Sequence, residues 1–265
     1  MRLRAVAIAT TAGLLLALAP TVSAEAARKP AYRVTIKTDK TRADVGQTIK
    51  VTGQVKGPKA TKKRLVVQRK VGTGAWRVVT KVRTNKKGRY ATKVKVTTAG
   101  QQYLRVVAPK SKKARLGVSS RRGYVGWRWL DLTTQPSWVE GAVAVKGPAT
   151  IAGTTYPKAI TFQNTGAYFS TVGSCDAFKS TAGVVDGGTD SGAALALTFT
   201  TAQPDSEPRE TVVALTAGQA PQSFRAALSG INLLAFGAGD GRIAVIAPQA
   251  HCTVNALPAV SFDPR

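Results

Sequence analysis

Alternation of apolar and polar residues constrains the fold of this chain more than any other feature. Residues 32–37 (YRVTIK), 49–56 (IKVTGQVK) and 89–96 (RYATKVKV) place apolar side chains at most second positions, with basic or polar residues between them. The turn-forming stretches GPKATKK, VGTGA and TNKKG divide this pattern into short segments. A period of two is typical of strands that bury one face, so the first half of the chain is predicted to form an antiparallel β-sandwich.

The second half of the chain also has the pattern of a β-protein. Short apolar runs occupy residues 168–172, 193–200, 211–215, 231–236 and 242–248, with turn signals such as DGGTDSG, QPDSEP and GAGDG between them. No segment keeps a helical period for more than about two turns. We therefore expect an all-β fold with two β-sandwiches, the second of jelly-roll type.

The N-terminus has the layout of a secretory signal peptide. MRLR gives a basic start, residues 5–19 form an apolar core, and TVSAEAA offers small residues for cleavage after Ala24 or Ala26. The alternative is a membrane helix, but such a helix needs about 20 apolar residues. Residues 1–26 are therefore predicted to be a signal peptide, and the product is expected to be extracellular, with attachment to the cell wall as one location.

The chain has two cysteines, Cys175 and Cys252. A single pair in an exported protein favours one disulfide bond over two free thiols. The bond is expected to hold the segment after FSTVG against the last strands, with Cα atoms roughly 4.4–6.8 Å apart.

Positive charge is concentrated in one part of the chain. Residues 28–124 contain 29 lysines and arginines and two acids, Asp39 and Asp44, which is a formal charge of +27. Residues 125–265 contain eight basic and ten acidic residues. Such a change in composition marks a domain boundary. We expect domains at 32–118 and 126–265, joined by a linker at 119–125.

The alternating lysines of TNKKGRYATKVKV (84–96) have two interpretations. They keep the outer side of a strand hydrated and discourage edge-to-edge pairing, or they bind a polyanion. Solubility needs a net charge of only about 2–8 in a small domain, so this excess favours attachment to an anionic cell-wall polymer or another polyanion. The predicted polyanion-binding residues are Lys62, Lys63, Arg64, Lys86, Lys87, Arg89, Lys93 and Lys95.

Residues 32–118 resemble the immunoglobulin-like modules of secreted bacterial proteins. The resemblance rests on the entry ADVGQTIKVTGQV, a strand–turn–Trp hairpin around Trp76 and the closing strand YLRVVA. It implies an immunoglobulin-like β-sandwich, and its motifs indicate a fold rather than a function.

The second half resembles the NPCBM family of carbohydrate-binding modules, which have a galactose-binding-like fold. The segments that carry the resemblance are WLDLTTQ (129–135), IAGTTYPKAITF (151–162), YFSTVGSCDAF (168–178) and residues 210–241. Two segments depart from the family pattern, because FQNTGA (162–167) lacks a histidine and APQAHCTV (247–254) replaces an acidic, Trp-containing ending. The resemblance implies a glycan as a partner.

Sugar binding needs an aromatic platform and a few polar side chains that hydrogen-bond to hydroxyl groups. Trp127 and Trp129 share one face of a predicted strand, and their alternative role is core packing. The candidate carbohydrate-binding residues are Trp127, Trp129, Trp138, Tyr156, Gln163, Asn164 and Asp176.

The sequence offers little for catalysis. It has one histidine, His251, beside a predicted disulfide cysteine, and neither a Gly-x-Ser-x-Gly nor a His-Glu-x-x-His motif. Asp186 and Asp190 lie in a glycine-rich stretch, where aspartate serves turn geometry; a Ca²⁺ site there is the alternative.

We therefore expect a secreted protein that is not an enzyme and needs no cofactor, and that binds glycan and an anionic polymer. One alternative is an adaptor that binds a protein partner and has lost sugar binding, and another is a hydrolase with an unfamiliar site.

Overall fold

The computed structural model describes residues 29–140, 144–187, 192–201 and 207–260. The predicted signal peptide, 1–26, lies outside these residues. Within them the chain forms strands and one short 3₁₀ turn, which confirms the predicted all-β class. In this described part of the chain, no helix has the length and apolar character needed to cross a bilayer.

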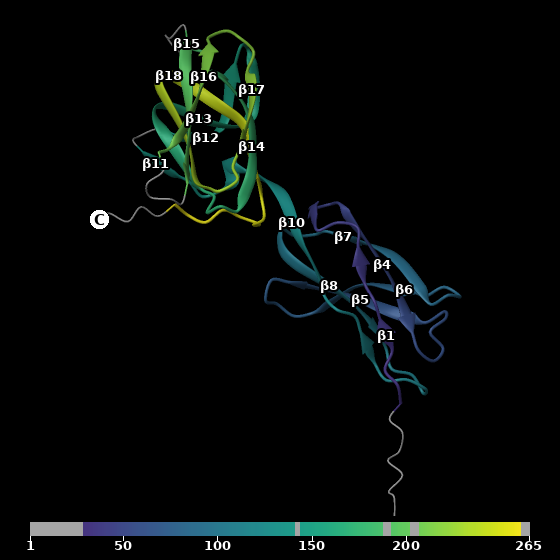
Figure 1. The fold of residues 1–265 in the computed structure, drawn as a ribbon. Coiled ribbons are helices and arrows are strands. Elements are labelled where there is room, and N and C mark those ends of the chain that lie inside the picture. The colour runs from purple at the N-terminus through teal and green to yellow at the C-terminus, as the bar shows by residue number, and fades with distance from the viewer. Residues whose placement is uncertain (1–28, 141–143, 188–191, 202–206, 261–265) are drawn as a thin grey trace, which may run out of the picture.

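The N-terminal lobe, residues 29–124, packs two sheets around one buried cluster (Figure 1). Its strands are β1 (Arg33–Val34), β2 (Lys37–Thr38), β3 (Arg42–Asp44), β4 (Thr48–Lys56), β5 (Arg64–Val71), β6 (Arg77–Arg83), β7 (Arg89–Lys95), β8 (Gly100–Ala108), β9 (Gly117–Val118) and the start of β10 (Arg122–Asp131). In one sheet β4 pairs with β1, β2 and β7. The other sheet runs β10–β8–β5–β6, and β3 joins β10 in parallel. The alternating apolar residues of these strands, including Ile49, Val51 and Leu104, fill the space between the sheets.

The C-terminal lobe, residues 125–260, is built around two long strands. Its elements after β10 are η1 (Leu132–Thr134), β11 (Trp138–Glu140), β12 (Ala144–Ile151), β13 (Thr154–Ser170), β14 (Cys175–Val184), β15 (Gly192–Thr201), β16 (Arg209–Thr216), β17 (Gln222–Ala227) and β18 (Ile231–Cys252). Strand β18 pairs with β15 and β13 along its first part and with β14 and β10 toward its end. The core of this lobe contains five phenylalanines, Phe162, Phe169, Phe178, Phe199 and Phe236.

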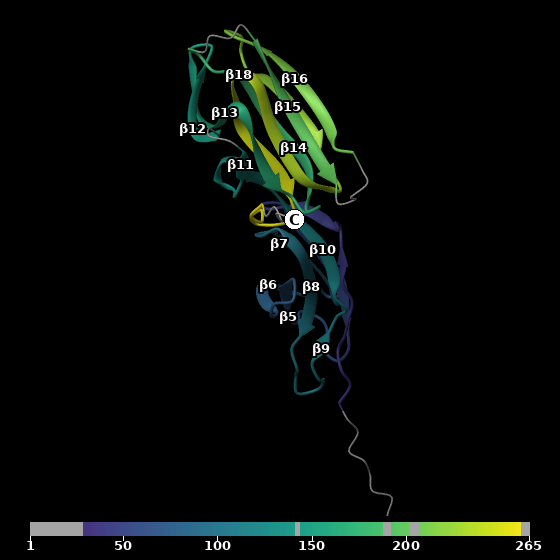
Figure 2. The same cartoon turned by 90° about the vertical axis from the view of Figure 1, so that its left-hand side faces the viewer.

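Strand β10 belongs to both lobes. Its first residues pair with β8 and β3 of the N-terminal lobe, and its last four, Arg128 to Asp131, pair with β18 of the C-terminal lobe. The two lobes therefore lie end to end along one continuous strand (Figure 2). The segment expected as a linker, 119–125, contains the start of this strand, and Ser119 before it is buried and hydrogen-bonded to the backbone of Val106 in both directions.

The predicted disulfide bond joins Cys175 and Cys252 and holds the first residue of β14 against the last residue of β18. The two Cα atoms are 3.9 Å apart, closer than the expected range. The cysteines are direct cross-strand partners in an antiparallel pair. The close type of such a pair brings Cα atoms to about 4.5 Å, less than the roughly 5.5–6 Å that is commonest in disulfides.

Replacing Cys175 and Cys252 together by serine should lower the free energy of unfolding by about 2–5 kcal/mol. Both cysteines are buried, and the cross-link restricts the unfolded chain. Urea unfolding of the double variant should give the same loss as reduction of the wild-type protein. An unchanged midpoint in both experiments would contradict this role.

Asp131 provides a second test, because its carboxylate accepts hydrogen bonds from Thr133 in η1 and from Lys158 in β13. Burial by itself raises the pKa of Asp131, but the hydrogen bonds from Lys158 and Thr133, together with the charge of Lys158, outweigh burial and lower the pKa. A lowered pKa stabilises the fold above the ordinary pKa of aspartate, and this contribution disappears as the pH falls through the folded-state value.

The variant Asp131→Asn should therefore have a lower melting temperature than the wild type at neutral pH. The difference should narrow below about pH 4, where an unfolded aspartate becomes protonated. Thermal unfolding of both proteins as a function of pH measures this. A difference that stays constant down to the most acidic pH would show that the charge of Asp131 is not what stabilises the fold.

Candidate functional site

The outer side of the β1/β2–β4–β7 sheet carries a cluster of cations, which we call the cationic face. Its members all have exposed side chains and alternate with buried residues along their strands. They are Arg33, Lys37, Lys50, Lys56, Arg89, Lys93 and Lys95. The pairing register places Lys50 directly opposite Lys93, and Arg33 directly opposite Lys56. The face is therefore a product of strand pairing as well as of alternation.

Like charges directly opposite each other in a sheet destabilise it by roughly 0.2–1 kcal/mol per pair. Besides the two pairs on the cationic face, the second sheet of the lobe has Arg64 opposite Arg83 and Arg69 opposite Arg77. The lobe has few carboxylates to offset this repulsion.

Both acids of the N-terminal lobe already have partners. Asp39 accepts a hydrogen bond from the backbone N–H of Lys50, and Asp44 contacts His251. Among the ion pairs between described residues, only one uses a lysine or arginine of residues 29–124, and that residue is Arg42. The positive charge of the lobe is thus left without neutralising partners in the described chain.

The structure distributes the eight predicted polyanion-binding residues over three adjoining segments. Arg89, Lys93 and Lys95 lie on the cationic face, and Lys86 and Lys87 lie in the turn before β7. The third segment is Lys62 and Lys63, which precede β5, and Arg64, which is its first residue. Thr84 joins this third segment to the turn, because its backbone N–H donates to Lys63 and its hydroxyl accepts from the N–H of Lys63.

An open groove of about 710 Å³ lies beside the cationic face and has no carboxylate in its lining. Lys37, Arg83 and Arg89 supply its cations, and its remaining lining residues are mainly threonine, glutamine and asparagine. The buried ring of Tyr90 borders it and donates a hydrogen bond to the carbonyl of Thr35 at 2.6 Å; burial raises the pKa of this tyrosine. Sequence reasoning missed Lys37, Lys50 and Arg83, because alternation shows which side a residue faces but not which strands lie beside each other.

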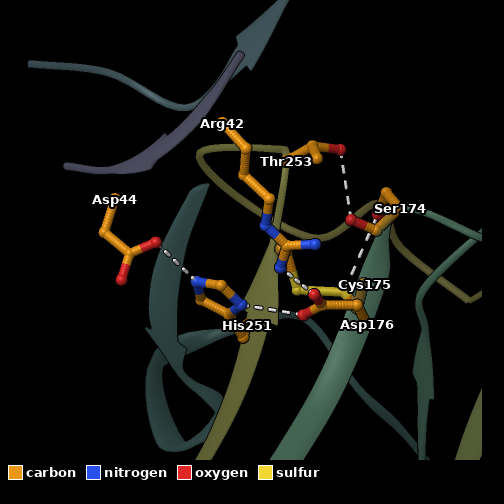
Figure 3. Close-up of polar contacts among 8 residues, drawn as sticks. Arg42, Asp44, Ser174, Cys175, Asp176, His251 and Thr253 are labelled. Atoms are coloured by element: carbon orange, nitrogen blue, oxygen red, sulfur yellow. Dashed lines mark hydrogen bonds and ion pairs between the residues drawn. A yellow bond between two sulfur atoms is a disulfide. The ribbon is translucent and has the colours of Figure 1, made fainter. Parts of the chain in front are cut away.

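A second cluster lies where the two lobes meet (Figure 3). His251 of β18 has one ring nitrogen, Nδ1, 2.7 Å from a carboxylate oxygen of Asp176 and the other, Nε2, 3.1 Å from a carboxylate oxygen of Asp44. The guanidinium of Arg42 forms an ion pair with Asp176. Asp44 and Arg42 belong to β3, whereas Asp176 follows the disulfide cysteine Cys175, so this network links the N-terminal lobe to the disulfide-bonded end of the C-terminal lobe.

Aromatic rings and cations extend this network into a stack. The guanidinium of Arg42 lies 3.8 Å from the ring centroid of Trp127. The ring of His251 stacks on Trp127, with 5.1 Å between centroids, and lies tilted against Trp129 at 4.8 Å. The ammonium of Lys179 lies 4.2 Å from the ring of Trp129. We call these five residues the junction stack. Cation–π contacts of this kind contribute about 0.5–2 kcal/mol each.

The structure does not bring the seven predicted carbohydrate-binding residues together. Trp127, Trp129 and Asp176 lie at the junction between the lobes. Trp138 of β11 packs on Tyr168, 5.1 Å between ring centroids. The other three are on β13: Tyr156 packs against a small apolar cluster, while Gln163 and Asn164 are exposed at an irregularity of the strand.

Asp186 has a structural role in the described chain. Its two carboxylate oxygens accept the backbone N–H groups of Ala152 and Gly153, each at 2.7 Å, at the turn between β12 and β13. Asp190, its proposed partner in a Ca²⁺ site, lies outside the described residues. Among those that are described, no group of three or more His, Cys, Asp and Glu residues is arranged to hold a metal ion.

The chain matches no protein-family model and no curated protein. The immunoglobulin-like and NPCBM resemblances therefore stay predictions. Among solved structures, a match is found to a crystal structure titled "Putative membrane anchored protein" from Corynebacterium diphtheriae, at 10% identity and a TM-score of 0.25. The match covers 88% of this chain and 60% of that one, and at this TM-score it supports no inference.

The variant His251→Ala should loosen the contact between the lobes, because it removes a nearly buried ring that contacts two tryptophans and two carboxylates. We expect the free energy of unfolding to fall by about 2–3 kcal/mol. Amide hydrogen exchange should accelerate in β3 and at Val45 directly after it, whose N–H donates to the backbone carbonyl of Trp127.

The matched control is Gln249→Ala, two residues earlier on the same face of β18, where the cross-strand partner is Asp131 of the C-terminal lobe. It should leave exchange in β3 unchanged. Equal exchange rates in His251→Ala and the wild type would show that the junction stack does not couple the lobes.

Proposed function

We propose that the chain is an exported, non-catalytic attachment protein whose N-terminal lobe binds an anionic polymer of the cell surface. The observation that carries the proposal is the cationic face, where Lys50 and Lys93 stand directly opposite each other and no described carboxylate forms an ion pair with either. The export signal and the disulfide bond support an extracellular location.

The face suits a polymer better than a single small anion. Side chains two residues apart on a strand are separated by about 6.6–6.8 Å, and neighbouring strands by about 4.8 Å. Lys93 and Lys95 on β7 and Lys50 on β4 therefore form a two-dimensional array of charges, and the groove lined by Lys37 and Arg89 continues it. A chain with repeated phosphate or carboxylate groups can contact several of these cations at once and relieve their mutual repulsion.

Glycan binding by the C-terminal lobe remains part of the proposal. The nominated side chains of that lobe lie in separate places, so they do not support a single site built from all seven. A partner protein on this lobe is the competing proposal, and binding of neutral glycans separates the two.

The cationic face can be tested with the triple variant Lys50→Gln, Lys93→Gln, Lys95→Gln. Binding to poly(glycerol phosphate) and to polygalacturonate should be measured over a range of salt concentrations. By analogy with nucleic acids, each lost contact should flatten the plot of log K against log salt by about 0.7–0.9. The variant should be as stable as the wild type or slightly more stable, because it removes a like-charged pair.

The matched control is Lys110→Gln, Lys112→Gln, Lys113→Gln, which removes the same charge from the exposed loop between β8 and β9. This control should keep the wild-type salt slope. If both triple variants lose the same slope, the net charge acts without a defined face. If the wild-type protein binds neither polymer at low salt, attachment to an anionic polymer is wrong.

A further inference from the structure

A second groove, distinct from the cationic face, lies at the junction between the lobes. It has a volume of about 450 Å³ and is lined by Asp44, Val45, Gly46 and Gln47 on one side and by Arg128 and Trp129 of β10 on the other. Asp44 ends β3 and residues 45–47 connect it to β4 in the N-terminal lobe, whereas Arg128 and Trp129 pair with β18 of the C-terminal lobe. The groove thus exists only because β10 holds the ends of the two lobes together, and grooves between domains are frequent ligand sites.

The polar atoms of this groove keep hydrogen-bonding capacity that the chain itself does not use. One carboxylate oxygen of Asp44 contacts His251, and the other has no described partner. The side-chain oxygen of Gln47 accepts the backbone N–H of Asp44 at 3.3 Å, which leaves its NH₂ group as a donor. The guanidinium of Arg128 donates from Nη1 to the side-chain oxygen of Asn255 at 3.4 Å, and its Nη2 group has no described partner. An acceptor and two kinds of donor therefore line one small groove.

Trp129 supplies an apolar surface beside these polar groups. The residue is 36% exposed, so part of its ring is open to solvent. One neighbour of the ring is His251, which lies between two carboxylates; the other is the ammonium of Lys179, 4.2 Å from the ring centroid, which a stacked sugar ring would displace. At Gly46 the position of a Cβ atom has no heavy atom within 4 Å, so the groove is open on that side.

The charge of the groove distinguishes its ligand from that of the cationic face. The junction groove has one acid, Asp44, and one base, Arg128, and its formal charge is zero, whereas the larger groove has three cations and no acid. A neutral saccharide matches this composition, because its C–H face packs on an aromatic ring and its neighbouring hydroxyls both donate to a carboxylate and accept from amide and guanidinium groups.

We propose that the junction groove binds a neutral saccharide unit, with Trp129 as the platform and Asp44, Gln47 and Arg128 as hydrogen-bonding partners. The inference rests on the proposed carbohydrate binding and gives it a location, but it does not depend on the cationic face. The cationic face would hold the charged polymer and the junction groove a neutral sugar of the same surface.

The test uses the full exported chain on an array of neutral hexose and N-acetylhexosamine oligosaccharides at about 0.5 M salt, where the Debye length is about 4–5 Å and the cationic face is screened. The best-retained oligosaccharide is then titrated while tryptophan fluorescence is recorded. We expect retention that is insensitive to salt and a fluorescence change on binding.

Three variants identify the site. Trp129→Ala should weaken binding about tenfold or more, and Gln47→Ala, which leaves the junction stack intact, should weaken it about two- to tenfold. Trp138→Ala removes a tryptophan of similar exposure on β11 and should bind like the wild type. Unfolding curves for each variant identify loss of structure, and Gln47→Ala alone is decisive if Trp129→Ala does not fold.

Three results would overturn the inference. The first is that the wild type retains no neutral oligosaccharide. The second is that Trp138→Ala loses binding while Gln47→Ala keeps it, which moves the site to β11. The third is that retention disappears as salt rises, which assigns it to the cationic face. None of these results bears on binding of poly(glycerol phosphate), so failure here and failure of the attachment proposal are distinguishable.

Discussion

The pairing of one strand, β10, with both halves of the molecule is the interaction on which the rest of the structure depends. Because its ends belong to different sheets, the backbone itself fixes the orientation of the lobes. The junction stack acts at the same place, with Trp127 and Trp129 presented on one side of β10 to His251. The side-chain contacts of the junction stack then only need to prevent local separation of two lobes whose relative orientation β10 already sets.

The cationic face and the junction between the lobes differ in how their charges are neutralised. In the N-terminal lobe, buried apolar residues pack two sheets together and thereby hold like charges opposite each other at the spacing of neighbouring strands. At the junction, every charge of the network has a partner of opposite sign or an aromatic ring: Arg42 meets Asp176 and Trp127, and His251 meets Asp44 and Asp176. Unneutralised charge favours a polyanion, whereas the balanced groove beside it favours a neutral polar ligand.

Local patterns in the sequence predicted much of the fold. Alternation in residues 32–37, 49–56 and 89–96 predicted strands there and the correct outward side for Lys93 and Lys95. A lone cysteine pair, in a chain with the pattern of an export signal, predicted the disulfide bond. Such patterns repeat within a few residues, so they can be read without knowing which strands are neighbours.

Long-range pairing could not be predicted in this way. Nothing local shows that Lys50 faces Lys93, that Asp44 meets a histidine 207 residues later, or that SSRRGYV runs into a strand shared by both lobes. The same limit explains Trp127 and Trp129. Their shared face was correctly inferred, but core packing does not describe two rings that contact a histidine and two cations between the lobes.

Backbone ¹⁵N relaxation of the protein without its predicted signal peptide tests the central claim, that β10 makes the two lobes one rigid body. The account predicts the same rotational correlation time for amides of the N-terminal and C-terminal lobes, and ordered amides throughout Arg122–Asp131. Shorter and different correlation times for the two lobes, with flexible amides near Trp127, would contradict it.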